Sequence, residues 1–129
     1  MANYLQEREQ FFLDSKITEP NANQPGNLNL QVLTNNIRRW ATERNLHTAD
    51  HTKQALKLGE EAGELFEGLA KDDTDLVRDA IGDIFVVLTI LSMQIGYSIE
   101  SNIELAYEEI KDRKGRMIDG VFVKESDLK

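Results

Sequence analysis

The sequence predicts an all-α protein with a four-helix core, a short N-terminal extension and a small C-terminal β-hairpin. Apolar residues recur at helical spacing through most of the 129 residues. Residues that favour helix ends separate these stretches from one another. An apolar segment near the C-terminus is centred on Asp119-Gly120, a typical hairpin turn. A chain of this length forms one core rather than two, so we expect a single helical domain over residues 28–123.

Residues 1–27 form the N-terminal extension that precedes this domain. Residues 3–14 can form a short helix, because their large apolar side chains fit one helical face. Residues 18–27 contain two prolines, a glycine and several asparagines, which indicates a loop.

Two helices are expected next, the first near residues 28–45 and the second from an N-cap at Asp50 to about Ala70. The residues predicted to face inward on the first helix are Leu30, Leu33, Ile37, Trp40 and Ala41. Those predicted to face inward on the second helix are Ala55, Leu58, Ala62, Leu65, Phe66 and Leu69.

The third helix has strong N-cap candidates at Asp72, Asp73 and Thr74, and Gly96 is a natural stop beyond its end. Since only a short loop joins the second and third helices, we expect them to pack antiparallel.

The fourth helical region contains a possible capping box at Ser101 and Glu104 and ends before Gly115. Residues 117–123 are expected to form the hairpin, and residues 124–129 a C-terminal tail.

Composition excludes several classes of function. The net charge of −8 argues against binding to nucleic-acid polymers or acidic membranes, where Lys and Arg must dominate. Cysteine is absent, which excludes disulfides, thiolate zinc sites and a cysteine nucleophile. The N-terminus lacks a signal-peptide pattern, and the apolar stretch 84–93 is shorter than the roughly 20 residues that a membrane span needs. We therefore expect a cytoplasmic protein that does not bind membranes.

Acidic residues on the second and third helices are the most informative feature. Glu60, Glu61 and Glu64 share one helical face, as do Asp79 and Asp83 on the next helix. Asp83 interrupts an almost wholly apolar run, where an ionised carboxylate is costly unless it is paired or bound to metal. Two facing helices with these five carboxylates would repel each other without cations between them, and divalent ions are the simplest solution.

Carboxylate ligands without Cys or a His-rich motif favour Mg²⁺ or Mn²⁺ over zinc or copper. Such an ion can bridge phosphate oxygens and activate water for in-line attack. A di-iron site would need a His three residues after an acid, and neither His47 nor His51 has that position. The alternative is a solvated acidic stripe formed by Glu60, Glu61, Glu64 and Glu67.

The segments Leu56-Lys-Leu-Gly-Glu-Glu-Ala-Gly-Glu-Leu65 and Asp79-Ala-Ile-Gly-Asp83 resemble the MazG-like nucleoside triphosphate pyrophosphohydrolases. Residues 38–46 and 109–115 are similar to the small phage-type members of that family. The pattern of that family is Glu-Glu-x-x-Glu followed, after a variable spacer, by Glu-x-x-Asp. The resemblance covers residues 30–123. It implies a helical fold, dimers or tetramers with sites at subunit boundaries, and Mg²⁺-dependent cleavage of an NTP or dNTP to the monophosphate and pyrophosphate.

Carried over by position, the resemblance implies that Glu61, Glu64 and Asp83 are metal ligands. Glu60 matches the leading glutamate, which would orient or deprotonate the attacking water.

The sequence departs from the family pattern at Ala80, where a metal-binding Glu is expected. Asp79 lies four residues before Asp83 on the same face and could bind the metal in its place. This departure leaves the number of metal ions and the catalytic rate open.

Several cationic and aromatic residues are candidates for substrate binding. Lys53 and Lys57 precede the acids on their helix and can contact a phosphate or pair with a glutamate. Trp40 can stack on a nucleobase or pack in the core. The basic residues at the end of the fourth helix can bind a triphosphate or interact with the helix dipole; they include Lys111, Arg113 and Lys114.

Two functions follow from these observations. The first is a pyrophosphohydrolase in which water attacks a metal-bound nucleotide at the α-phosphorus without a covalent intermediate. The second is a catalytically weak helical module for oligomerisation or nucleotide sensing, for which Ala80 is the main argument. In either case we expect a homodimer or homotetramer, because the apolar 80–93 helix is too widely apolar for one chain to cover.

Overall fold

The computed structural model describes residues 29–128, so the predicted helix over 3–14 and the loop over 18–27 lie outside the described residues. The chain divides into two compact units, Met1–Asn36 and Ile37–Lys129. In the first unit, the described residues are the beginning of a helix, whose first turn is capped by the Asn29 side chain accepting from the Gln31 amide at 2.7 Å. The candidate site lies in the second unit.

Most of the described chain is helical, as the sequence predicted. Four α-helices are present between residues 29 and 128: α2 (Leu30–Glu43), α3 (His51–Ala70), α4 (Thr74–Gln94) and α5 (Ile99–Ile110). A short 3-10 helix, η1 (Leu46–Thr48), precedes α3, and another, η2 (Glu125–Asp127), follows the hairpin strands β1 (Gly115–Ile118) and β2 (Val121–Lys124). None of the helices in this part of the chain is both long enough and apolar enough to cross a membrane.

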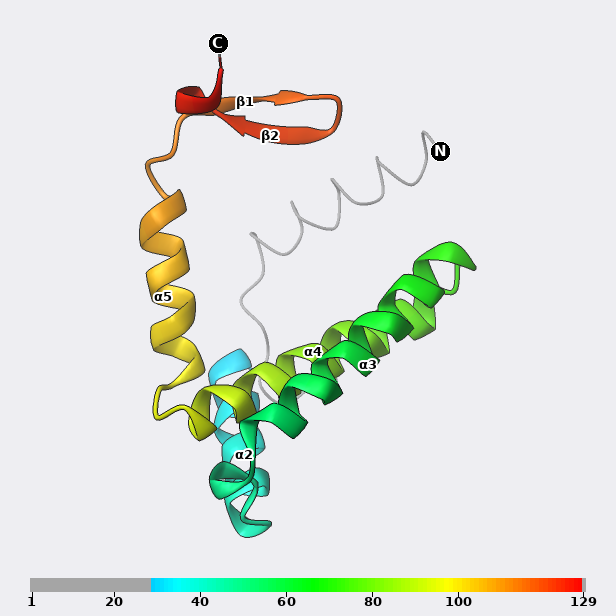
Figure 1. Cartoon of the computed structure of the whole chain (residues 1–129), viewed down its shortest axis with the longest axis vertical. Coiled ribbons are helices and arrows are strands. Elements are labelled where there is room, and N and C mark those ends of the chain that lie inside the picture. The colour runs from blue at the N-terminus through cyan, green and yellow to red at the C-terminus, as the bar shows by residue number, and fades with distance from the viewer. Residues whose placement is uncertain (1–28, 129) are drawn as a thin grey trace. The chain divides into compact units, whose positions relative to one another are not determined.

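The helices α3 and α4 form an antiparallel pair joined by a tight turn (Figure 1). Asp50 caps the start of α3 by accepting from the Thr52 amide at 2.9 Å, as predicted. After α3, Asp72 adopts the left-handed conformation with φ of 52°, and the Asp73 amide donates to the Gly68 carbonyl at 2.9 Å. The side chain of Asp73 then caps α4 through the Leu76 amide. This turn reverses the chain within three residues and brings the acidic segment of α3 beside α4.

Gly68 permits the two helices to approach closely. A Cβ atom at this position would lie 2.9 Å from the Val77 Cγ2 atom and 3.0 Å from the Val77 backbone nitrogen. The backbone nitrogen cannot move aside without displacing α4, so the clash must be relieved by separating the helices.

We therefore expect Gly68→Ala to destabilise the fold by about 1–2 kcal/mol, because inserting a methyl group into a packed contact costs about 1–3 kcal/mol and the higher helix propensity of alanine offsets part of that cost. The matched control is Gly82→Ala on α4, where a Cβ meets nothing within 4 Å. That variant should gain about 0.5–1 kcal/mol, because alanine loses less backbone entropy in a helix. Urea unfolding measures both, and equal stabilisation by the two variants would contradict the close crossing at Gly68.

The buried face of α3 differs from the predicted one. Leu58 and Leu65 are half-buried, as expected, but Phe66 and Leu69 are 66% and 58% exposed and Ala55 is also exposed. The prediction treated a broad apolar sector as inward-facing. In the structure, where α3 approaches α4 closely at Gly68, a narrower sector of α3 faces α4. This sector of α3 includes the buried carboxylate of Glu61.

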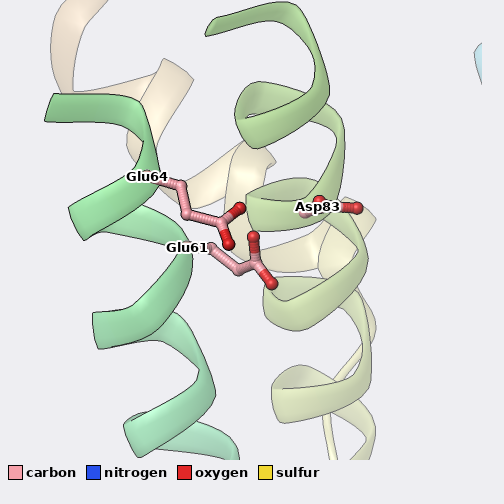
Figure 2. A group of neighbouring side chains, drawn as sticks. All are labelled: Glu61, Glu64 and Asp83. Carbon is pink, nitrogen blue, oxygen red and sulfur yellow. The ribbon is translucent and has the colours of Figure 1, made fainter. Parts of the chain in front are cut away.

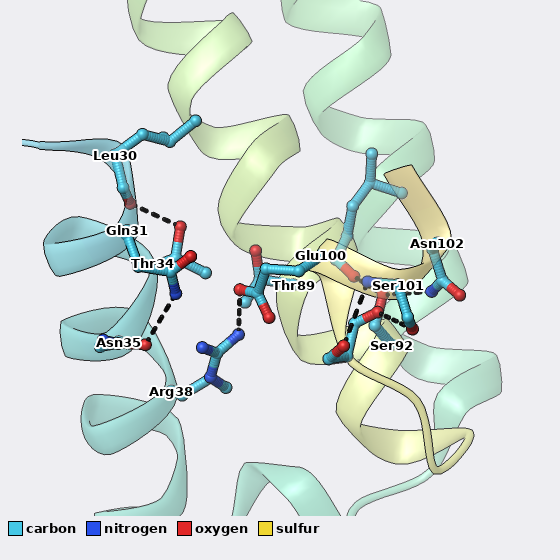
Figure 3. A network of polar contacts seen from close by, with 12 residues as sticks. Leu30, Gln31, Thr34, Asn35, Arg38, Thr89, Ser92, Glu100, Ser101 and Asn102 are labelled. Atoms are coloured by element: carbon cyan, nitrogen blue, oxygen red, sulfur yellow. Dashed lines mark hydrogen bonds and ion pairs between the residues drawn. The ribbon is translucent and has the colours of Figure 1, made fainter. Parts of the chain in front are cut away.

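The beginning of α5 also differs from the prediction. The cap is Ser98, whose hydroxyl accepts from the Ser101 amide at 3.1 Å, so Ser101 lies inside the helix rather than at its start. Ser98 and Ser101 both have the chemistry of a cap, and only packing selects between them. The Asn102 amide group donates to the Ser92 hydroxyl of α4 at 3.0 Å, and Glu100 pairs with Arg38 (Figure 3).

The C-terminal hairpin is confirmed, with its turn at Asp119 and Gly120. Both residues have positive φ, 49° and 80°, as the twist of a two-residue hairpin loop requires. The antiparallel register pairs Gly115 with Lys124, so β2 extends one residue beyond the predicted end at Val123.

Candidate metal centre

Three carboxylates from two helices meet at the contact between α3 and α4. Glu61 and Glu64 are three residues apart on α3 and extend toward α4, which contributes Asp83 (Figure 2). One oxygen from each side chain lies within 4.8 Å of the others. With metal–oxygen bonds of about 2.1 Å, opposite ligands of Mg²⁺ are about 4.2 Å apart, so small side-chain rotations would let these oxygens share one ion.

The carboxylate of Glu61 is the most unusual of the three. Glu61 is only 6% exposed, whereas glutamates are almost never fully buried unless paired, and Lys57 pairs with only one of its two oxygens. Its Oε2 atom is buried and accepts no hydrogen bond. A buried unpartnered carboxylate oxygen carries a large desolvation cost, and a cation bound there would remove that cost.

Asp83 is half-buried, in the helix that the sequence showed as an apolar run. Partial burial raises the pKa of its carboxyl above the ordinary value of 3.8, and the negative charges of Asp79 and Glu61 raise this pKa further. Because the ionised form is disfavoured, protons and metal ions compete for the carboxylate, and a bound cation would reverse the electrostatic effect.

The ammonium group of Lys57 lies beside this cluster. Its Nζ atom is 3.2 Å from Glu60 Oε2 and 3.4 Å from Glu61 Oε1. Hydrogen bonds and charge interactions with Glu60 and then Glu61 raise the pKa of Lys57, so the group is fully charged at neutral pH. Of the two possibilities for Lys57, a phosphate contact or a glutamate pair, the described conformation has the pair.

The structure places the other predicted acids outside the group that can hold an ion. Glu60 is exposed and pairs with Lys57. Asp79 is also exposed, one turn before Asp83 on α4, near enough for its charge to raise the Asp83 pKa. Ala80, which stands where the resembled family has Glu, is fully buried.

The basic candidates at the end of α5 lie around an open pocket of about 440 Å³. Arg113 and Lys114 line it together with Lys124 of β2, and Glu109, Asp112 and Glu125 make its lining mixed in charge. Lys111 pairs instead with Glu108 on its own helix, at 2.6 Å. Sequence reasoning overlooked Lys124, although the predicted turn at Asp119-Gly120 already places Lys124 opposite Gly115 and therefore beside Lys114.

The two remaining substrate-binding candidates are both exposed. Trp40 is 46% exposed, which corrects the core-packing alternative, and the Arg44 guanidinium lies 4.4 Å from its ring centroid. The ring is therefore already covered on one face by a cation. Lys53 lies one turn before Lys57 on α3.

The comparisons with known proteins identify a relative without assigning a function. The chain is 52% identical over 67 residues to an "uncharacterized 18.2 kDa protein in rep-hol intergenic region" of Haemophilus phage HP1 (strain HP1c1). The match covers 50% of this chain and 40% of the phage protein, so the chain aligns with less than half of that relative's length. No protein-family model matches the chain, and no solved structure matches it.

Proposed function

We propose that this protein is a Mg²⁺-dependent, MazG-like nucleoside triphosphate pyrophosphohydrolase that cleaves an NTP or dNTP to the monophosphate and pyrophosphate. The observation that carries this proposal is the meeting of Glu61, Glu64 and Asp83 between two helices, with one glutamate oxygen buried and unpartnered. An acidic stripe that served only solubility would leave its carboxylates in water, whereas Glu61 is buried.

The donor set fits a hard divalent cation, Mg²⁺ or Mn²⁺, since all three ligands are carboxylate oxygens. When bound, such an ion would neutralise phosphate charge and lower the pKa of a bound water. Glu61 and Glu64 would hold the ion from α3 and Asp83 from α4. Glu60 would orient or deprotonate the attacking water from the exposed side of the cluster, where its carboxylate lies next to Lys57.

Ala80 favours the second candidate function, a nucleotide-sensing or oligomerisation module with little turnover. Ala80 is fully buried, and its methyl group cannot bind metal. The position where the resembled family has a glutamate ligand therefore supplies no ligand in this chain. Turnover of a panel of NTPs and dNTPs with Mg²⁺, with the products resolved, separates the two functions. Release of pyrophosphate supports the enzyme, and nucleotide binding without release supports the sensor.

Divalent metal should stabilise the folded protein, because only the folded state gathers the three ligands. At a metal concentration of 100 times Kd, the gain is about 2.7 kcal/mol, which should raise Tm by roughly 5–10 °C. Differential scanning calorimetry with Mg²⁺ or Mn²⁺ measures the shift, and NaCl at equal ionic strength controls for screening. Glu61→Gln should lose the response; a wild-type Tm that ignores millimolar Mg²⁺ and Mn²⁺ would refute the metal site.

We also propose that the protein assembles as a homodimer or homotetramer through the outer face of α3. Leu56 and Phe66 are 71% and 66% exposed, and Gly59 and Gly63 lie between them on the same helical face. Large exposed apolar side chains on one helical face favour an interface, and the glycines between them would let a second helix approach closely. Closed two-fold symmetry would then place two copies of this face against each other.

A further inference from the structure

The Glu61 carboxylate can interact with two positive charges, the Lys57 ammonium and the proposed divalent cation. Its Oε1 atom is 3.4 Å from the Lys57 ammonium. One oxygen of Glu61 also lies within 4.8 Å of oxygens of Glu64 and Asp83, the other two proposed metal ligands. The second oxygen, Oε2, is buried and unpartnered. Lys57 itself is exposed, so its side chain can leave Glu61 without unfolding α3.

An ion bound through Oε1 would lie close to this ammonium. With a metal–oxygen bond of about 2.1 Å, the two cations would be at most about 5.5 Å apart if Lys57 kept its position. Solvent screens part of the repulsion at that separation, because the Lys57 side chain is 54% exposed, while the Glu61 carboxylate that both cations would share is buried. An ion bound through Oε1 would therefore either be weakened by Lys57 or displace its ammonium, whereas an ion bound only through Oε2 would share the charge of the carboxylate with it.

We propose that Lys57 competes with the divalent cation for Glu61, and that the polyphosphate of the substrate relieves this competition by taking over the ammonium. The inference rests on the proposed function and adds a link between metal binding and substrate binding. Lys57 is then a positioning residue that lowers metal affinity in the free protein and strengthens binding of the metal–triphosphate complex. The Lys57 side chain is 54% exposed, so it can exchange its glutamate partners for a phosphate without displacing packed residues.

The test is a titration of the full chain with Mn²⁺ in the absence of nucleotide, in which electron paramagnetic resonance measures the concentration of free Mn²⁺. Lys57→Met keeps the length of the side chain and removes its charge, and should bind Mn²⁺ at least about fivefold more tightly than the wild type. Lys57→Arg keeps the charge and should resemble the wild type. Lys71→Met, which removes an exposed cation that pairs with Glu67 at the end of α3, controls for the loss of a surface charge and should have a smaller effect.

The second measurement is the KM for the best-hydrolysed nucleotide at saturating Mg²⁺. Lys57→Met should raise KM by at least about fivefold, because the ammonium no longer contacts the polyphosphate, while Lys71→Met should change it less. Unchanged or weaker Mn²⁺ binding by Lys57→Met, or an unchanged KM, overturns the inference even if the wild type binds metal. Absence of Mn²⁺ binding in every variant instead refutes the metal site on which the proposed function depends.

Discussion

Asp83→Asn should reduce turnover by at least about 100-fold, because it removes the ligand that α4 contributes to the proposed metal site. Glu61 and Glu64 alone come from one helix, so without Asp83 nothing in the described cluster holds the ion from the opposite side. The measurement is pyrophosphate release at saturating Mg²⁺. The matched control is Glu67→Gln, which removes an exposed acid of α3 that pairs with Lys71 and should retain activity.

Asp83→Asn should also change the thermal stability of the metal-free protein. The pKa of Asp83 is raised in the folded state, so ionised Asp83 destabilises the fold, and stability is lost as pH rises through this raised pKa. Asp83→Asn removes that cost and should have a higher metal-free Tm than the wild type at pH 7. The difference should disappear below pH 3.8, the ordinary value, where the carboxyl is protonated in both states.

Asp79→Asn tests whether the neighbouring acid replaces the glutamate missing at Ala80. If Asp79 binds metal when substrate is present, the variant should lose most activity. If Asp79 acts only through its charge, the variant should keep turnover and lower the pKa of Asp83, because one of the causes of the raised pKa is removed. Wild-type turnover together with an unchanged metal response would leave Asp79 as a surface acid.

Leu56→Asp combined with Phe66→Asp should convert the proposed oligomer into a monomer of 14.7 kDa. The two carboxylates would be buried without partners in a symmetric interface, next to their own copies, which costs several kcal/mol. Light scattering at micromolar concentration measures the mass. Thr74→Asp combined with Ser126→Asp adds the same charge at exposed positions outside this face and should remain oligomeric.

A wild-type protein that is monomeric and active would contradict the assembly. If sites are shared between subunits, mixing an Asp83→Ala chain with an Arg113→Ala, Lys114→Ala chain should restore part of the activity. Demonstrated mixed oligomers without restored activity would show that each chain builds its site alone.

Local features of the structure were predictable from the sequence, because each depends on a few adjacent residues. The caps at Asp50 and Asp73 need only a side-chain oxygen that reaches a nearby backbone amide. The turn at Asp119-Gly120 depends on positive φ, which these residue types tolerate. The acidic spacing on α3 and the position of Asp83 in the apolar run of α4 likewise predicted that these carboxylates lie near one another.

Tertiary packing decided which of several suitable residues is used. Gly68 lets α3 and α4 approach closely, and in this packing Glu61 is buried while Phe66 is exposed. It also brings Glu61, Glu64 and Asp83 together and leaves Asp79 outside the group. Helical periodicity restricts a side chain to a face, but distances of a few ångströms between two helices depend on how closely their backbones approach. For this protein the sequence determined which carboxylates share a helical face, and the close packing of α3 and α4 decided which of them meet.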